Sequence, residues 1–225
     1  EFRRVLFRSV LMTLSGAPDT PQRGKPAIGP ERTISVIIPT RDNGLLLRAA
    51  VRSLLEHAAQ PERVEILIVD NDSVDPASLA VLTELSWRPG TRIVPLREAF
   101  NWSRANNLAA AQTTCDVLLF LNDDTEMLTP GWDRVLSGAL ARNGVGLVGA
   151  RLLYPDRTIQ HAGFVFGMDN GPQHEGRWMP ETDQGPAGRW TATRPAVAVT
   201  GACMAMARAD FVALGGFDEE TFAVD

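Results

Sequence analysis

The stretch that decides the fold is residues 34–42, which read Ile-Ser-Val-Ile-Ile-Pro-Thr-Arg-Asp. Its β-branched apolar run is typical of a buried strand, and the polar residues after Pro39 indicate a turn at the strand's carboxyl end. Two later apolar runs end in the same way, in Asp70-Asn71-Asp72-Ser73 and in Asn122-Asp123-Asp124-Thr125. Since the carboxyl ends of parallel strands share one edge of a sheet, these three polar clusters are expected to meet there.

Helical periodicity between and after these strands predicts an α/β fold. Helices are expected at residues 45–55, 102–112 and 208–214, and after the pairs Asp75-Pro76 and Thr129-Pro130. Further strands are expected at residues 64–69, 92–96, 116–121, 145–149 and 196–207. Strands that alternate with helices predict a mostly parallel central sheet with helices on both faces.

Two stretches fall outside this alternation. Residues 15–33 are rich in Pro and Gly, so residues 1–32 are expected to be a disordered or foreign segment and linker, and residues 33–225 the domain. Residues 154–195 are rich in Gly, Pro and Trp, which predicts a long excursion with a short hairpin near 159–166. Its Trp178 and Trp190 are expected either to stack on sugar rings or to pack the excursion.

Composition and motifs exclude several classes of protein. A formal net charge of -5 argues against a nucleic-acid partner, and no apolar run approaches the roughly 18 residues that span a bilayer. The glycine-rich motifs of dinucleotide-binding and P-loop proteins are absent, as is the Gly-x-Ser-x-Gly of serine hydrolases. Cys115 and Cys203 match no metal-binding spacing and fit a reducing cytoplasm.

The acidic pair Asp123-Asp124 is the first candidate for chemistry. Adjacent carboxylates repel each other unless a cation compensates, and Mg²⁺ is held by one or two carboxylates together with substrate phosphates. The pair therefore suggests a metal–diphosphate site, with a solvated acidic turn as the alternative. Asp70 and Asp72 can accept hydrogen bonds from a base or a ribose, or can form turns ahead of the next helix. Arg41 can contact a phosphate or pair with an aspartate.

Beyond these clusters, residues 34–224 resemble the family 2 glycosyltransferases of GT-A fold, particularly O-antigen and rhamnosyl-type members. The resemblance rests on residues 36–42, 68–73, 100–107 and 121–126. It implies a site for the donor nucleotide formed by Pro39, Thr40, Arg41, Asp70, Asp72, Asn107 and Asp123, and it makes Asp124 the ligand of a divalent metal, Mg²⁺ or Mn²⁺. Asn122 replaces the first acid of the family's Asp-x-Asp motif, which bears on metal affinity.

Three later segments, residues 159–163, 200–203 and 215–219, also resemble family elements. They imply an acceptor or sugar pocket that includes His161, Gly201 and Asp218, although His161 is equally well read as a structural histidine on a hairpin. In the family, the carboxylate that acts as catalytic base follows the Gly-Gly-Phe-Asp-Glu loop. The base is therefore expected beyond Asp225, and a domain that is incomplete at its C-terminus is expected to bind donor and to transfer sugar poorly.

The resemblance implies an inverting glycosyltransferase that moves a sugar from a nucleoside-diphosphate sugar to a saccharide or lipid-linked acceptor. Bacterial cell-surface polysaccharide synthesis, in the cytoplasm or peripherally at the inner face of the cell membrane, is the expected setting. One alternative is a non-catalytic module that binds nucleotide sugars. The other is a sugar-phosphate nucleotidyltransferase. Such enzymes carry a glycine-rich loop after the first strand, whereas the loop at residues 39–44 of this chain contains a single glycine, Gly44.

Overall fold

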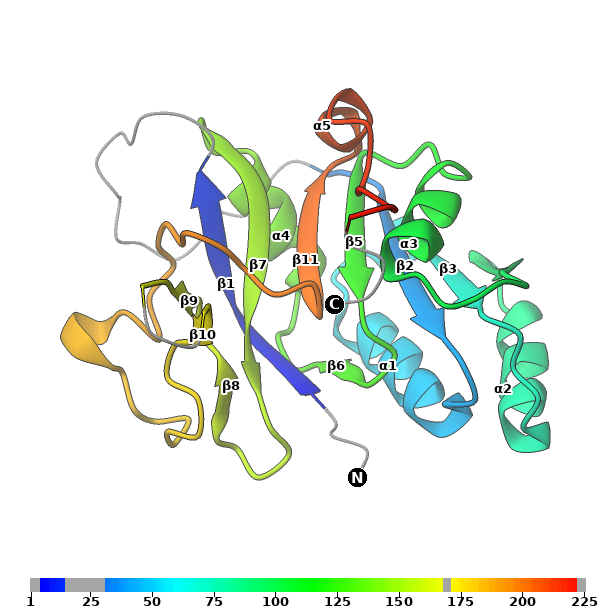
Figure 1. Cartoon of the computed structure of the whole chain (residues 1–225), viewed down its shortest axis with the longest axis horizontal. Coiled ribbons are helices and arrows are strands. Elements are labelled where there is room, and N and C mark those ends of the chain that lie inside the picture. Colours follow the sequence, from blue (N-terminus) through cyan, green and yellow to red (C-terminus); the bar gives the residue numbers. More distant parts are fainter. Residues whose placement is uncertain (1–4, 15–30, 168–170, 222–225) are drawn as a thin grey trace.

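The computed structural model describes residues 5–14, 31–167 and 171–221. The strands of the main sheet are β1 (Val5–Leu14), β2 (Ile34–Thr40), β3 (Val64–Asp70), β4 (Thr91–Pro95), β5 (Val117–Leu121), β6 (Thr125–Met127), β7 (Val145–Leu153), β8 (Ile159–His161) and β11 (Cys203–Ala207). They are arranged in the order β4-β3-β2-β5-β11-β7-β1-β6, with β8 beside β7 (Figure 1).

The helices are α1 (Gly44–His57), α2 (Pro76–Ser86), α3 (Trp102–Ala110), α4 (Trp132–Leu140) and α5 (Arg208–Ala213), with short 3₁₀ turns at Pro61–Arg63 and Pro186–Gly188. Successive strand residues point to opposite faces of the sheet, so β2 contributes side chains to two separate hydrophobic cores. Val36 and Ile38 pack in one core with Leu47 of α1, whereas Ile37 packs in the other with Ala105 of α3. Helices therefore cover both faces, with α3 in front of the sheet and α4 behind it in Figure 1.

The parallel part of the sheet is the half that follows the decisive stretch. Strands β4, β3, β2 and β5 are parallel neighbours, and the arrowheads of β2 and β5 point to the lower edge in Figure 1. Strand β11 then runs antiparallel to both β5 and β7. The α/β fold expected from the sequence, with helices on both faces of the sheet, is confirmed, and its polar strand ends do meet at one edge.

Residues 5–14 are not disordered, which was one of the two expectations for residues 1–32. These residues form β1, which pairs antiparallel with β7 and, over Val5–Phe7, parallel with β6. Without β1, one side of the nine-residue strand β7 would be unpaired, since β8 and β11 both lie on its other side. Such pairing between segments more than a hundred residues apart has no local signature, so the sequence did not indicate this strand. Residues 15–30, the expected linker, lie outside the described residues.

Three smaller expectations also need correction. The strand expected at 196–207 is confined to Cys203–Ala207, and α4 begins after Gly131 in a left-handed conformation (φ +68°), not at Thr129-Pro130. The expected hairpin at 159–166 does not form, because β8 pairs with β7 while β9 (Phe164–Val165) pairs with β10 (Gln173–His174).

The two tryptophans of the excursion pack it internally. The rings of Trp178 and Tyr154 stack with centroids 4.4 Å apart, and Trp190 packs on Leu153 and Ile159. In the part of the chain that the structure describes, no helix has the length and apolar character needed to cross a membrane.

Candidate functional site

A cleft of about 420 Å³ opens where the parallel strands end. Its walls are formed by Pro39, Thr40, Arg41, Asn43, Asn71, Phe100, Trp102, Asn122 and Asp123. Four of these residues, Pro39, Thr40, Arg41 and Asp123, were expected from the sequence to contact a nucleotide. The structure therefore brings the polar ends of β2, β3 and β5 together around one cavity, as open parallel sheets generally do.

Asp123 is held at the bottom of this cleft by the residues that follow β2. Thr40 Oγ1 donates a 2.7 Å hydrogen bond to Asp123 Oδ2, and Asn43 Nδ2 lies 3.5 Å from Oδ1. Burial nevertheless raises the pKa of Asp123, and the two hydrogen bonds only partly oppose that effect. Both carboxylate oxygens thus have partners, and the side chain is fixed in one orientation.

Asp124, unlike Asp123, has a carboxylate oxygen without a hydrogen-bond partner in the described structure. Burial first, and then the charge of Asp123 beside it, raise the pKa of Asp124 to about 6. Its Oδ1 is buried without a hydrogen-bond partner in the described structure. A buried carboxylate oxygen with nothing to bind is the kind of group that a hard divalent cation satisfies. The described residues hold no group of three or more His, Cys, Asp or Glu side chains able to bind a metal, so other ligands of a cation here would come from substrate phosphates or water.

Arg41 supplies positive charge at the cleft. The side chain is exposed and lines the cavity, and it pairs with no acid among the described residues. The neighbouring Asp42 is occupied instead, because its Oδ1 accepts hydrogen bonds from the backbone nitrogens of Val74 and Asp75, at 2.7 and 2.8 Å. That contact ties the loop after β2 to the loop after β3, which fixes the two strand ends relative to each other.

Asp70 and Asp72 lie beside the cleft and do not line it. Asp70 Oδ1 accepts a 3.1 Å hydrogen bond from Ser73 N, which is the turn that the sequence offered as an alternative. Asp72 is exposed and adopts a left-handed conformation (φ +57°), one of the few that Asp tolerates better than most residues.

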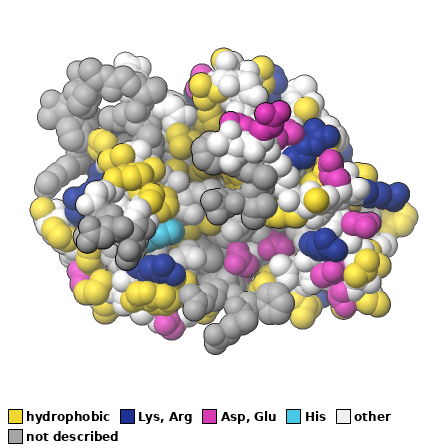
Figure 2. All heavy atoms as spheres, viewed as in Figure 1, with side chains coloured by type: hydrophobic (Ala, Val, Ile, Leu, Met, Phe, Trp, Pro, Cys, Tyr) yellow, Lys and Arg dark blue, Asp and Glu magenta, His cyan; other side chains and the backbone are white. Residues whose placement is uncertain are grey.

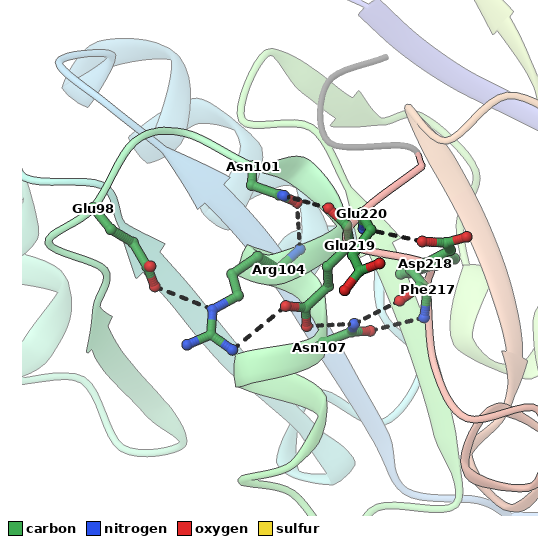
Figure 3. Close-up of polar contacts among 8 residues, drawn as sticks. All are labelled: Glu98, Asn101, Arg104, Asn107, Phe217, Asp218, Glu219 and Glu220. Carbon is green, nitrogen blue, oxygen red and sulfur yellow. Dashed lines mark hydrogen bonds and ion pairs between the residues drawn. The ribbon is translucent and has the colours of Figure 1, made fainter.

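Asn107 and Asp218, expected at the nucleotide and acceptor sites, lie in a separate polar cluster between α3 and the loop after α5 (Figure 3). Asn107 Nδ2 donates to Phe217 O at 2.9 Å and to Glu219 Oε1 at 2.8 Å, and its Oδ1 accepts from Phe217 N at 2.9 Å. Asp218 is exposed and caps the backbone nitrogens of Glu220 and Thr221. The amide of Asn107 is therefore fully used in holding this loop on α3.

Gly201 permits a close approach, although the neighbour is a protein side chain. A Cβ at this position would lie 3.2 Å from Cζ2 of Trp102, a residue that lines the cleft. The glycine therefore makes room for one wall of the cavity, where the sequence suggested room for a ligand.

His161 is fully buried in this fold. Its Nδ1 lies 3.0 Å from Nδ1 of His174, and its ring packs edge-on against Phe164. Burial, followed by the charges of His174 and Arg194, lowers the pKa of His161 to about 3, so the ring stays neutral at physiological pH. Its Nε2 is buried without a hydrogen-bond partner in the described structure, so both readings that the sequence left open stay predictions.

Four further residues line the cleft and were not expected there from the sequence, namely Asn43, Asn71, Phe100 and Trp102. Asn71 lies inside the polar cluster after β3, and both aromatic residues fall in the motif at residues 100–107, so each had a local signal. Their meeting at one cavity depends on the loop between β4 and α3 returning across the strand ends, which no sequence pattern specifies.

Figure 2 shows acidic and basic side chains interspersed over the side of the molecule that carries α2 and α3.

Comparison with known proteins agrees with this geometry. Residues 35–188 match the family model described as glycosyl transferase family 2. The chain is 40% identical over 202 residues to the O-antigen biosynthesis protein RfbC of Myxococcus xanthus, and 37% identical over 193 residues to the uncharacterized protein y4gI of Sinorhizobium fredii. These alignments cover 88% and 85% of this chain but 15% and 21% of those proteins, so the chain spans only a small part of their length.

A solved structure shares the fold. The mannosyltransferase PcManGT of Pyrobaculum calidifontis, in complex with GDP-Man and Mn²⁺, superposes with a TM-score of 0.61 at 17% sequence identity. The match covers 92% of this chain and 52% of that structure. The family model and the two relatives together establish that the chain belongs to glycosyl transferase family 2.

Proposed function

We propose that this chain is the part of an inverting glycosyltransferase that binds the nucleoside-diphosphate sugar. The observation that carries the proposal is the buried, unpartnered Oδ1 of Asp124 beside a cleft lined by strand-end residues. A carboxylate whose charged form is disfavoured, next to a cavity with a free arginine, suits a ligand that brings both a cation and phosphates.

The residues present fit a divalent cation, Mg²⁺ or Mn²⁺. Asp124 would hold it, and Asp123 would lie beside the ribose and the diphosphate. The cation's chemistry would be to neutralise negative charge on the diphosphate. The mannosyltransferase with the same fold is described with GDP-Man and Mn²⁺, which supports a metal in this fold without naming the donor of this chain.

The protein's own groups bind and orient the rest of the donor. Arg41 lies at the mouth of the cleft, where its guanidinium can pair with a phosphate. Thr40 holds Asp123 in place by its 2.7 Å hydrogen bond. Asp70 keeps Oδ2 available, since Ser73 occupies only Oδ1, and Asp72 is exposed beside it. We propose these two aspartates as contacts for the base or ribose from the cleft's edge.

The acceptor in this proposal is a saccharide or a lipid-linked saccharide of the bacterial cell surface. The relative from Myxococcus xanthus is named for O-antigen biosynthesis, which supports polysaccharide synthesis as the setting. Such an acceptor would place the protein in the cytoplasm or at the inner face of the cell membrane. Membership of family 2 disfavours the nucleotidyltransferase alternative.

The test is calorimetric titration of the folded protein with UDP, dTDP and GDP, each with Mn²⁺, with Mg²⁺ and with EDTA. We expect one nucleotide to bind in a metal-dependent manner, and we expect Asp124→Ala to abolish that dependence. Asp156→Asn is the matched control, because Asp156 is exposed, lies in the turn before β8, and an asparagine oxygen can still accept from Thr158 N. Equal binding with metal and with EDTA, or no binding at all, would refute the proposal.

A further inference from the structure

Phe100 is an exposed aromatic side chain at the cleft. Its side chain is 41% exposed, and of the large hydrophobic residues that the described structure leaves exposed, it alone lines the cavity. Trp102, the other aromatic residue of the cavity, is committed to the core, with its ring 4.9 Å from that of Phe217 and 6.4 Å from that of Phe120. Phe100 has no ring partner within the described ranges, so one face of its ring is available to a ligand.

Asn71 fixes the chain just before Phe100. The residue is only 1% exposed, and its backbone nitrogen donates a 3.0 Å hydrogen bond to Thr40 O. Its Nδ2 donates to Leu96 O at 2.9 Å and to Glu98 O at 2.8 Å. Turning the amide over would set its oxygen against two carbonyl oxygens, so the orientation is determined by these partners. Asn71 thus pins the segment that follows β4 onto the end of β3.

A second brace holds the chain on the other side of Phe100. Glu98 Oε1 pairs with Arg104 Nε at 3.1 Å, and Asn101 Oδ1 caps α3 by accepting from Arg104 N at 2.8 Å. Asn101 Nδ2 also donates to Glu219 O at 2.9 Å, which joins this brace to the loop after α5 (Figure 3). Phe100 therefore stands between two anchored residues, Glu98 and Asn101. A surface fixed before a ligand arrives loses less entropy on binding.

The order of the strands indicates which part of a donor reaches Phe100. The acidic pair follows β5, Arg41 follows β2, and Asn71 follows β3, in the spatial order β5-β2-β3. Neighbouring strands lie about 4.8 Å apart, so Asn71 is roughly 10 Å from the acidic pair along the edge. With a diphosphate at the acidic pair, the nucleoside extends towards β3.

We propose that Phe100 is the wall on which the nucleobase of the donor stacks, and that Asn71 is the positioning residue that holds Phe100 there. This inference rests on the proposed function, because it requires a nucleoside diphosphate in the cleft. Every nucleobase has an apolar face that stacks on an aromatic ring. Phe100 therefore contributes affinity for the nucleoside, and the edge of the base is read by other groups.

The experiment measures the Kd of the bound nucleoside diphosphate with Mn²⁺ by calorimetry, for wild type and for variants at position 100. Base–aromatic stacking is worth about 1–3 kcal/mol, so Phe100→Ala is expected to weaken binding by about 5-fold to 150-fold. Phe100→Tyr should retain most of the affinity. Phe166→Ala is the matched control, because Phe166 is also exposed, at 51%, and does not line the cleft. Pyrophosphate with Mn²⁺, which has no base, should bind wild type and Phe100→Ala equally.

The role of Asn71 is tested by a double-mutant cycle. Asn71→Ala should weaken nucleotide binding in the wild-type background and have little further effect in the Phe100→Ala background, since it acts through Phe100. Asn71→Asp, which keeps the shape and removes the two donated hydrogen bonds, serves if the alanine variant does not fold. Additive losses would overturn the positioning role.

The outcomes also separate this inference from the function on which it rests. If wild type binds no nucleoside diphosphate, the proposed function is overturned and the inference falls with it. If wild type binds and Phe100→Ala binds as tightly, or if pyrophosphate binding falls by the same factor as nucleotide binding, only the stacking role of Phe100 is overturned.

Discussion

Replacing Asp124 by asparagine should stabilise the protein while removing its metal site. The pKa of Asp124 is raised from its usual 3.8 to about 6. A raised carboxyl pKa means that the folded state binds the proton more tightly than the unfolded state does. The stabilisation due to this proton is complete below about pH 4 and is lost as the pH rises through about 6. At pH 7.5 the charged carboxylate therefore destabilises the fold, and a neutral amide of the same shape does not.

The magnitude follows from the size of the shift. About two pKa units correspond to roughly 3 kcal/mol at 1.36 kcal/mol per unit. Asp124 is partly exposed, so solvent screening reduces the expected gain to about 1–2 kcal/mol. Active sites commonly carry such a cost in stability, because the groups they need are unfavourable without a ligand.

The assay is urea unfolding of wild type and Asp124→Asn at several pH values between 4 and 7.5, in EDTA. We expect the variant to be more stable at pH 7.5 and the difference to vanish near pH 4. Adding Mn²⁺ with the bound nucleotide should raise the stability of wild type only. Asp156→Asn, at an exposed carboxylate outside the cleft, controls for the loss of one charge. A variant that is less stable than wild type at pH 7.5, or a difference that does not change with pH, would show the reasoning to be wrong.

Two further substitutions test contacts that shape the site. Thr40→Val removes the hydrogen bond to the partly buried Asp123. Hydrogen bonds to charged groups contribute about 1.5–3 kcal/mol, so urea unfolding at pH 7.5 should show a loss of that order in the free energy of unfolding. An unchanged urea midpoint would contradict the contact. Gly216→Ala and Gly215→Ala both place a side chain at positive φ (+82° and +84°), but only at Gly216 would the new Cβ meet Asn107 Oδ1 at 2.8 Å. We expect both variants to lose about 1 kcal/mol or more of folding stability, and Gly216→Ala to lose more because it also displaces the Asn107 amide. Equal thermal unfolding of the two variants would argue against the role of Asn107 in holding the loop after α5.

Local pattern was enough to place most of the core elements. The runs at Ile34–Ile38 and Val64–Val69 are continuous and β-branched, which is required of strands buried on both faces. Asp75 and Pro76 specify the start of α2, and Asp75 does accept from Ser78 N at 2.8 Å. Because parallel strands end at one edge, the sequence alone assigns the polar residues that follow them to one site.

Only the tertiary structure decided which side chains reach the cleft and which are consumed in holding the fold. Asn107 looked like a ligand-binding residue in sequence, yet its side-chain amide is committed to Phe217 and Glu219. His161 has one ring nitrogen, Nδ1, in contact with His174. Phe100 and Asn71, in contrast, were not expected at the site from the sequence, and long-range contacts bring them to the cavity. The pairing of β1 with β7 is of the same kind. The sequence by itself determined most of the core elements, because local periodicity specifies them. Contacts between distant segments depend on packing that local pattern does not record.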